Sequence, residues 1–562
     1  LSWKRWWNTN LIASALMVCY ALFQVLGAIK PSQSDARVDG TFGNAIYLAV
    51  YLLFNIFIAL LFMLREKHNK TLRYAYGILI LFQFLILYYT ATRGAILGLI
   101  GGLLILALLN LKNKNDQVLR RLSLGLVLGF LVLLGGFFAL RNTQFVQTSP
   151  VLSRFATLNL SEVKTQGRYF IWPMAWQGFK ERPLLGWGQE NFSYVFQKHY
   201  DPAMYNLEPW FDRAHNIFLD WMVAAGGLGI ISYLLLYLIP LHLIWKGSKP
   251  FSYLEKSVFT ALLAAYFFHN IFVFDHLMSY ILFFSLLSYL QTREGGTFLW
   301  EKSLSAKNWQ TFGVPAVLIL LIPSFYFINW KPMTANNSLI EALGASQTAN
   351  PVKAVTAFEK AYKGSVLGRS ETVEQMAVYA PGILSSNLSV EEKNVFFAFV
   401  KESITSEADR FARDARLQLV TGNFLLTTDS ASEALTYLNR ARELAPYKQH
   451  TYFELGSFYI NQNDLEKGLE AFRTAYELAP QYAEAKMIYL IGSIYAEDFA
   501  LEGKLINEMD QNKFIFDDRI LSAYYNKKRF ADALRIVERR KELDPARSAD
   551  YDALLNQIRN SQ

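Results

Sequence analysis

The chain has 562 residues, of which 52% are hydrophobic and 15% aromatic, and this content excludes a protein that is soluble throughout. Its formal net charge is +8, but the basic residues lie mostly in short loops between apolar runs, which indicates membrane orientation and not nucleic-acid binding. The single cysteine, Cys19, excludes an intramolecular disulfide and a cysteine metal cluster. Because the sequence begins with Leu1 and not Met, we expect further sequence, with further spans, upstream of it.

Apolar runs long enough to cross a membrane fill the first part of the chain. A span needs roughly 20 mostly apolar residues. We therefore predict an all-α fold, with a polytopic membrane domain over residues 1–330 and a soluble helical domain over residues 331–562. The membrane domain has about nine predicted spans, at 11–29, 44–64, 74–91, 95–110, 122–140, 217–245, 257–274, 277–290 and 311–329.

The loops between these runs predict the orientation of the membrane domain. Basic residues gather in alternate loops, and the positive-inside rule makes that face cytoplasmic. The opposite face then receives the Thr92-Arg93-Gly94 turn, the long 141–215 loop and the whole C-terminal domain. Neither ATP nor nucleotide sugars reach that face. A reaction there therefore needs a substrate that is activated before it crosses, such as a glycan on a lipid diphosphate.

The C-terminal domain contains an internal repeat. The sequence Glu-Leu-Ala-Pro at 443–446 recurs at 477–480, a spacing of 34 residues, which is the tetratricopeptide period. Because arrays of such repeats usually bind a partner, we expect a protein partner on this domain. Small and aromatic residues fall at the interior positions of the repeat, at Ala434, Leu438, Ala441, Tyr452, Leu455, Gly456, Tyr459, Gly468, Phe472 and Ala475.

His215 is the first candidate for chemistry. It lies in Asp212-Arg213-Ala214-His215-Asn216, where the polar loop meets the next apolar run. A histidine at that place can stay neutral near pH 7 and accept a proton from a sugar hydroxyl. The alternative is an interfacial histidine that caps the helix beginning at Asn216.

Three arginines are candidates for binding an anion. Arg93 interrupts an otherwise apolar stretch, and ionisable residues within membranes are usually functional. The alternative is a turn whose arginine extends into the lipid headgroups. Arg37 and Arg168 are ordinary loop arginines singly, but with Arg93 they would form a cluster suited to a diphosphate. No acidic cluster with metal-ligand spacing accompanies them, so we expect the arginines to replace a divalent cation, with no cofactor.

Two further motifs have weaker functional signals. Pro183 to Gly188 forms a turn in which Gly186 and Gly188 permit close backbone approach, and shaping the loop is the favoured interpretation. Asp275 lies at the outward end of a helix pair, where it is placed to orient an imidazole or pair with an arginine, although a plain polar turn also explains it.

These motifs, taken in order, resemble those of a known family. The similar elements are Arg-x-x-Gly-x-x-Gly-Asn from Arg37, the Thr-Arg-Gly turn, Gly-Arg-x-x-x-Trp, Pro-Leu-x-Gly-x-Gly, Ala-His-Asn-x-x-Leu and His-Asn-x-Phe-x-x-Asp, which ends at Asp275. The set resembles the bacterial O-antigen ligase and polymerase superfamily, which includes the protein O-oligosaccharyltransferases. The resemblance covers roughly residues 20–290, and the tail resembles the tetratricopeptide extension that some members carry.

The resemblance implies a metal-independent glycosyltransferase of the bacterial inner membrane, which transfers or polymerises a glycan from undecaprenyl diphosphate. By its motif, His215 takes the role of the family's loop histidine, and Arg93 and Arg168 take its arginine roles at the donor diphosphate. Arg37, Arg213, Asp275, Gly186 and Gly188 are the candidate substrate-binding residues. The acceptor stays open among a lipopolysaccharide core, a growing polysaccharide and a protein. Members commonly have about a dozen spans, more than the nine predicted here.

A competing interpretation is non-enzymatic. The spans would then anchor a repeat scaffold that assembles an envelope complex, which explains the tail but not the outward arginines. A transporter would have ionisable residues spread through the membrane depth, whereas here they gather on one side.

Overall fold

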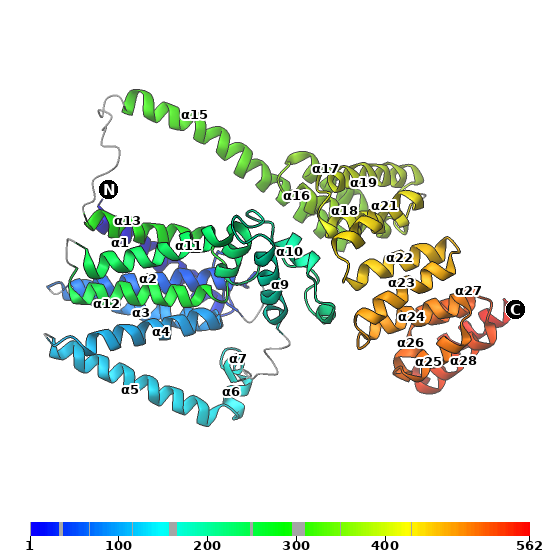
Figure 1. Cartoon of the computed structure of the whole chain (residues 1–562), viewed down its shortest axis with the longest axis horizontal. Helices are drawn as coiled ribbons and strands as arrows, with labels where there is room; N and C mark the ends of the chain where they lie inside the picture. The colour runs from blue at the N-terminus through cyan, green and yellow to red at the C-terminus, as the bar shows by residue number, and fades with distance from the viewer. Residues whose placement is uncertain are drawn as a thin grey trace. The chain divides into compact units, whose positions relative to one another are not determined.

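The computed structural model describes residues 2–32, 37–66, 68–114, 116–156, 166–247, 251–294, 309–348, 350–428 and 430–561. Every regular element in these ranges is helical, as the sequence predicts (Figure 1). Residues 157–165 of the predicted 141–215 loop and parts of the predicted cytoplasmic loops lie outside the described residues. The described residues form two compact units, which we call the membrane unit (Leu1–Phe192 with Phe211–Glu301) and the repeat unit (Ser193–Trp210 with Lys302–Gln562). The predicted domain ranges, 1–330 and 331–562, stay a prediction.

Seven helical stretches in the described ranges are long and apolar enough to cross a membrane. The other two predicted spans form helices α12 (Tyr253–Asn270) and α13 (Leu277–Glu294), which are short and have polar residues near their ends. The seven are α1 (Trp3–Val25), α2 (Ala45–Arg65), α3 (Lys70–Tyr89), α4 (Arg93–Leu111), α5 (Gln117–Leu140), α11 (Ile217–Lys246) and the stretch Trp309–Gln347, which contains α15 (Val314–Ser324) and α16 (Lys331–Gln347).

Helix α2 is the centre of the membrane unit. It is buried along most of its length and contacts α1, α3, α4, α12 and α13 (Figure 1). Nearly every residue of α2 is apolar, which fits a helix that is covered by protein on all sides. The short helix α12 is also largely buried, and Phe54 of α2 packs edge-on against Tyr266 of α12.

Helices α4 and α12 approach each other closely through glycine. A Cβ at Gly98 would lie 2.7 Å from the carbonyl oxygen of Ala265, and one at Gly102 would lie 2.8 Å from that of Ala261. Small residues spaced by four let membrane helices pack backbone to backbone. The glycine-rich part of α4 therefore serves packing, and it lies close in sequence to Arg93, the first residue of the helix.

The segment between α9 (Gly167–Glu181) and α11 contains two short helices, α10 (Phe192–Lys198) and the 3-10 helix η1 (Pro202–Asn206). Two further short helices, α6 (Gln144–Thr148) and α7 (Ser153–Ala156), follow α5.

The repeat unit consists of consecutive helices that pack in pairs, including α20 with α21 and α22 with α23. The predicted interior residues Ala434, Leu438, Ala441 and Ala475 are all fully buried. The tetratricopeptide assignment itself stays a prediction. Its helices after α16 are α17 (Pro351–Gly364), α18 (Arg369–Leu384), α19 (Val390–Arg410), α20 (Ala415–Leu426), α21 (Ala431–Leu444), α22 (Gln449–Asn461), α23 (Leu465–Leu478), α24 (Ala483–Ala496), α25 (Phe499–Asn507), α26 (Gln511–Phe516), α27 (Asp518–Asn526), α28 (Phe530–Leu543) and α29 (Ser548–Asn560).

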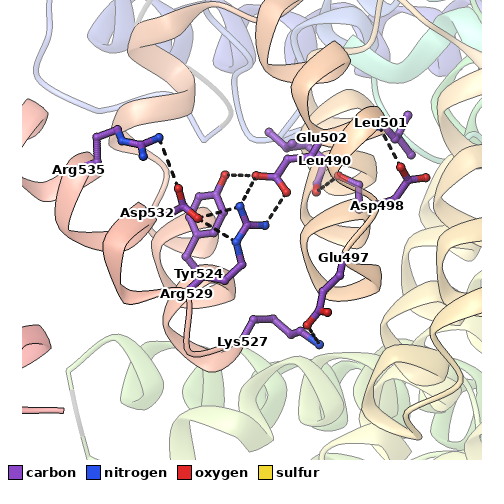
Figure 2. A network of polar contacts seen from close by, with 11 residues as sticks. Leu490, Glu497, Asp498, Leu501, Glu502, Tyr524, Lys527, Arg529, Asp532 and Arg535 are labelled. Carbon is purple, nitrogen blue, oxygen red and sulfur yellow. Dashed lines mark hydrogen bonds and ion pairs between the residues drawn. The ribbon is translucent and has the colours of Figure 1, made fainter. Parts of the chain in front are cut away.

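A partly buried ion pair joins the last helices of the repeat unit (Figure 2). The carboxylate of Glu502 on α25 accepts hydrogen bonds from both terminal nitrogens of Arg529, at 2.5 and 3.0 Å, and from the Tyr524 hydroxyl at 2.7 Å. The Nε of Arg529 donates to Asp532 on α28 at 2.9 Å. Charged groups are buried in proteins when they are paired in this way, and this pair ties α25, α27 and α28 together.

Candidate active site

The turn before α4 brings two of the predicted arginines together. The Nε of Arg37 donates to the carbonyl oxygen of Thr90 at 3.0 Å, and its Nη2 donates to the Thr92 hydroxyl at 3.1 Å. Thr92 is the N-cap residue of α4, and Arg93 is the first residue of that helix. The loop arginine and the intramembrane arginine therefore lie at one helix start, where backbone N–H groups also favour an anion.

Arg168 and Arg154 complete an arginine cluster, which we define as Arg37, Arg93, Arg154 and Arg168. Burial lowers the pKa of Arg168 from its ordinary value, and the charges of Arg93 and Arg154 lower it further. The pKa of Arg154 is lowered by burial and by Arg93, and that of Arg37 is lowered by burial and by Arg154. Each of these shifts combines burial with another cation, so the cluster repels itself and binding of an anion would relieve the repulsion.

Two observations about the cluster go beyond the predicted set. Arg154 has no motif around it, and sequence reasoning missed it; its only signal is its place on the predicted outward loop. Among the described residues, the buried Nε of Arg168 has no hydrogen-bond partner. A buried donor of this kind needs an explanation, and a ligand oxygen supplies one.

His215 has an unusual backbone conformation. Its φ is +51°, in the left-handed region that non-glycine residues rarely adopt. The neighbouring backbone is held on both sides, because the Ala214 N–H donates to Asp220 at 2.7 Å and the Ala214 carbonyl accepts from the Trp172 indole at 3.2 Å. Such conformations persist where the surroundings fix them, and they gather at functional sites. Asp220, in the first turn of α11, is a second residue that sequence reasoning missed.

The helix cap of α11, which is the alternative interpretation of His215, is its neighbour Asn216. The Asn216 side chain accepts from the N–H groups of Phe218 and Leu219, at 3.0 and 3.2 Å, and so caps α11 itself. The His215 imidazole lies between the rings of Phe211 and Phe274, with centroids at 5.7 and 5.4 Å.

The surroundings of His215 lower the pKa of its imidazole and so favour the neutral form. Burial lowers its pKa below the ordinary 6.5, and the charge of Arg168 lowers it further, against an opposing effect of Asp212. Arg168 therefore couples the histidine electrostatically to the arginine cluster. A neutral imidazole near pH 7 is the form that accepts a proton.

The predicted glycine turn lies against a break in helix α11. Gly226 has φ +64°, outside helical geometry, and the N–H groups of Trp187 and Gly188 donate to the Val223 and Ala224 carbonyls freed there, at 2.7 and 2.9 Å. A Cβ at Gly186 would lie 2.4 Å from the Val223 carbonyl oxygen. Irregular backbone at membrane depth has to be satisfied by protein in this way. This contact accounts for the glycine at 186, and a substrate-binding role for Gly186 and Gly188 stays a prediction.

Arg213 and Asp275 line a separate small cavity, of about 90 Å³, together with Glu190, Asp220 and Tyr280. Arg213 forms an ion pair with Glu190. The buried Asp275 accepts hydrogen bonds from Tyr233 at 2.7 Å, from Asn270 at 3.1 Å, from Ser279 at 3.2 Å and from Tyr266. Its hydrogen-bond partners in the described ranges are thus hydroxyl and amide groups, and neither an arginine nor an imidazole is among them.

Comparison with protein families identifies the same region. A family model described as O-antigen ligase matches residues 77–234, from within α3 to within α11. The match includes Arg93, Arg154, Arg168 and His215, whereas Arg37 and Asp275 lie outside it. No curated protein matches the chain significantly. In the part of the chain that the structure describes, no group of three or more His, Cys, Asp or Glu side chains is placed to hold a metal ion.

Proposed function

We propose that this chain, whose residues 77–234 match the O-antigen ligase family, is a membrane glycosyltransferase of that superfamily that transfers a glycan from undecaprenyl diphosphate to an acceptor hydroxyl. The arginine cluster beside His215 is the observation that carries this proposal. The reaction takes place on the extracytoplasmic face of the bacterial inner membrane, where we also place the 141–215 loop and the C-terminal domain, residues 331–562.

The arginine cluster binds the diphosphate of the donor. Guanidinium groups form paired hydrogen bonds with phosphate oxygens and keep their charge at any physiological pH. When the bond between the anomeric carbon and the phosphate oxygen breaks, undecaprenyl diphosphate leaves with an additional negative charge. Cations fixed before the reaction stabilise that developing charge more in the transition state than in the ground state, and this difference accelerates transfer.

His215 assists the acceptor. The acceptor oxygen attacks the anomeric carbon while its proton passes to the neutral imidazole, so the new glycosidic bond forms as the bond to phosphate breaks. The lowered pKa keeps the imidazole in its accepting form at neutral pH, and Arg168 contributes to that shift. The acceptor class is a lipid core, a growing polysaccharide or a protein, and the repeat unit is the place for a protein partner.

Complementation of cells that lack the gene tests the proposal. Membrane levels of each variant are matched, and lipid-linked glycan and its products are followed on gels. We expect His215→Ala to reduce product by about 100-fold or more, because a positioned proton acceptor contributes about 10²–10⁴-fold. Arg154→Ala should reduce it by about 100-fold, whereas Arg141→Ala, an exposed arginine after α5, should leave it unchanged.

The same experiment separates the enzyme from a non-enzymatic scaffold. A scaffold tolerates His215→Ala and Arg154→Ala as long as folded protein reaches the membrane. Accumulation of donor with loss of product supports the transferase, and the missing product identifies the acceptor. Wild-type amounts of product from both variants would refute the proposal.

A further inference from the structure

Residues 193–210, which we call the bound segment, interrupt the membrane unit and pack with the repeat unit instead. The segment contains most of α10 and all of η1, and it ends five residues before His215. Its side chains are buried like those of a core, since Val195, Phe196 and Met204 are fully inaccessible to solvent. Part of the 141–215 loop, which the sequence assigns to the membrane domain, therefore packs with the C-terminal helices.

The first attachment is made by Gln197, whose side chain pairs with the backbone. Its Nε2 donates to the Arg413 carbonyl oxygen at 2.7 Å, and its Oε1 accepts from the Ala415 N–H at 2.9 Å. Both polar atoms of a buried amide are thereby satisfied at the start of α20.

The second attachment is made by Lys448, at the start of α22. Its ammonium donates to the Pro209 carbonyl oxygen at 2.6 Å and lies 4.2 Å from the ring centroids of both Tyr200 and Trp210. The side chain is almost fully buried, with 1% exposed. Lysine is almost never buried without partners, and here a carbonyl and two aromatic faces, all from the bound segment, surround the charge.

The third attachment is made by Gln449 and by Tyr205. Gln449 donates to the Pro202 carbonyl oxygen at 2.8 Å, and the Tyr205 ring stacks on Tyr482 of the repeat unit at 4.5 Å. Lys448 and Gln449 both donate to backbone carbonyl groups of the bound segment, a kind of contact that helical-repeat proteins also make with peptide ligands. The bound segment thus occupies the repeat unit as a peptide ligand would.

This arrangement bears on His215 through the short connection from Trp210. Five residues span at most about 18 Å when fully extended, so displacement at Pro209 or Trp210 is transmitted with little slack. Within this connection, Ala214 is held by Asp220 and Trp172 directly before His215, so that fixed point lies only four residues after Trp210. Resting on the proposed function, we propose that Lys448 is a positioning residue, which holds the bound segment so that the His215 loop keeps its catalytic geometry.

Replacement of Lys448 by methionine tests this role in the full-length chain. Met keeps an apolar stem but lacks the ammonium. Initial rates are measured in membranes over a range of added lipid-linked glycan, extracted from cells that lack the gene. We expect kcat to fall by about 10–100-fold with KM for the glycan donor little changed, because a misplacement of about 1 Å costs about 100-fold. Hydrogen exchange should rise in residues 199–216 and stay unchanged in α22 and α23.

A second variant that weakens the attachment and two control variants accompany Lys448→Met. Gln197→Leu loosens the segment at its other end and should also lower kcat, even if Lys448→Met inserts poorly. Lys467→Met removes an exposed lysine of α23 that pairs with Asp464, and it should change neither rate nor exchange. Lys448→Arg, which keeps a charged donor, should recover part of kcat.

The outcomes distinguish this inference from the proposed function. Raised exchange in 199–216 with wild-type kcat in both Lys448→Met and Gln197→Leu would overturn the positioning role while leaving the transferase intact. Wild-type product from His215→Ala would instead refute the proposed function, and the positioning role with it. Loss of kcat together with raised exchange across the whole repeat unit would show that Lys448 serves stability alone.

Discussion

Gly98→Ala, compared with Gly101→Ala, tests whether the contact between α4 and α12 sets the position of Arg93. Both glycines lie on α4, the helix that begins with Arg93. A Cβ at Gly98 would meet the Ala265 carbonyl oxygen at 2.7 Å, whereas a Cβ at Gly101 would meet nothing within 4 Å. The same change on the same helix therefore has two expected outcomes.

The magnitude follows from the contact distances. Ordinary contact for a Cβ begins near 3.4 Å, so Gly98→Ala requires α4 and α12 to separate by about 0.7 Å at this point. Overpacking of this kind costs about 1–3 kcal/mol, or about 5–150-fold in an equilibrium constant. Arg93 is five residues away, about 7.5 Å along the helix, so much of the displacement reaches it. We expect transfer to fall by about tenfold. For Gly101→Ala the helix gains about 1 kcal/mol of propensity, and activity is unchanged.

The assay is product formation in membranes at matched protein levels, combined with thermal unfolding of the detergent-solubilised chain. Gly98→Ala should lower both the activity and the midpoint, and Gly101→Ala should lower neither. Equal activity for the two variants would refute the link between this helix contact and Arg93.

Two further predictions concern charged groups. Arg168→Gln should move the acid limb of the pH–rate profile to higher pH. His215 must be neutral to accept a proton, burial and Arg168 both lower its pKa, and the variant removes the effect of Arg168. Arg168→Lys keeps the positive charge and should leave the acid limb near its wild-type position. Arg529→Met should lower the free energy of local opening across α25 to α28 by about 3 kcal/mol, measured by hydrogen exchange, since it leaves the buried Glu502 carboxylate without its cation. Arg535→Met, on the exposed face, is the control, and an equal loss for both variants would contradict this account.

The helices were predictable because their signals are local. An apolar run of about 20 residues has few alternatives to a helix in the membrane, and the seven stretches that qualify coincide with predicted spans. The 257–274 and 277–290 runs were also identified as helices. Their polar ends, including Glu255 and His269, distinguish α12 and α13 from the other spans, and burial of α12 against α2 and α4 makes up for the lower apolar content.

The candidate site was predictable only where a motif marked it. The Thr-Arg-Gly turn and the Arg37 loop are distinctive enough in sequence to be paired, and the structure joins them through Thr90 and Thr92. Arg154 lies in a stretch without motif or periodicity, so nothing in the sequence distinguishes it from a solvated loop arginine. The break at Gly226 was hidden for a different reason: two adjacent glycines in an apolar run also suit an unbroken membrane helix.

The place of the bound segment depends on contacts that local patterns do not encode. Lys448 and Pro209 are 239 residues apart, and the sequence around either residue does not predict their contact. The available hint was compositional: Val195, Phe196, Tyr200, Met204 and Trp210 make the loop too apolar to be fully solvated, so it needed a partner surface. A loop with such residues, placed directly before a candidate catalytic histidine, has its apolar groups covered by the repeat unit and its last residues fixed by Asp220. The strained backbone of His215 directly follows the second of these attachments, at Ala214, and precedes the first residue of α11 by two positions, so a conformation that is unfavourable by itself is maintained by the contacts next to it.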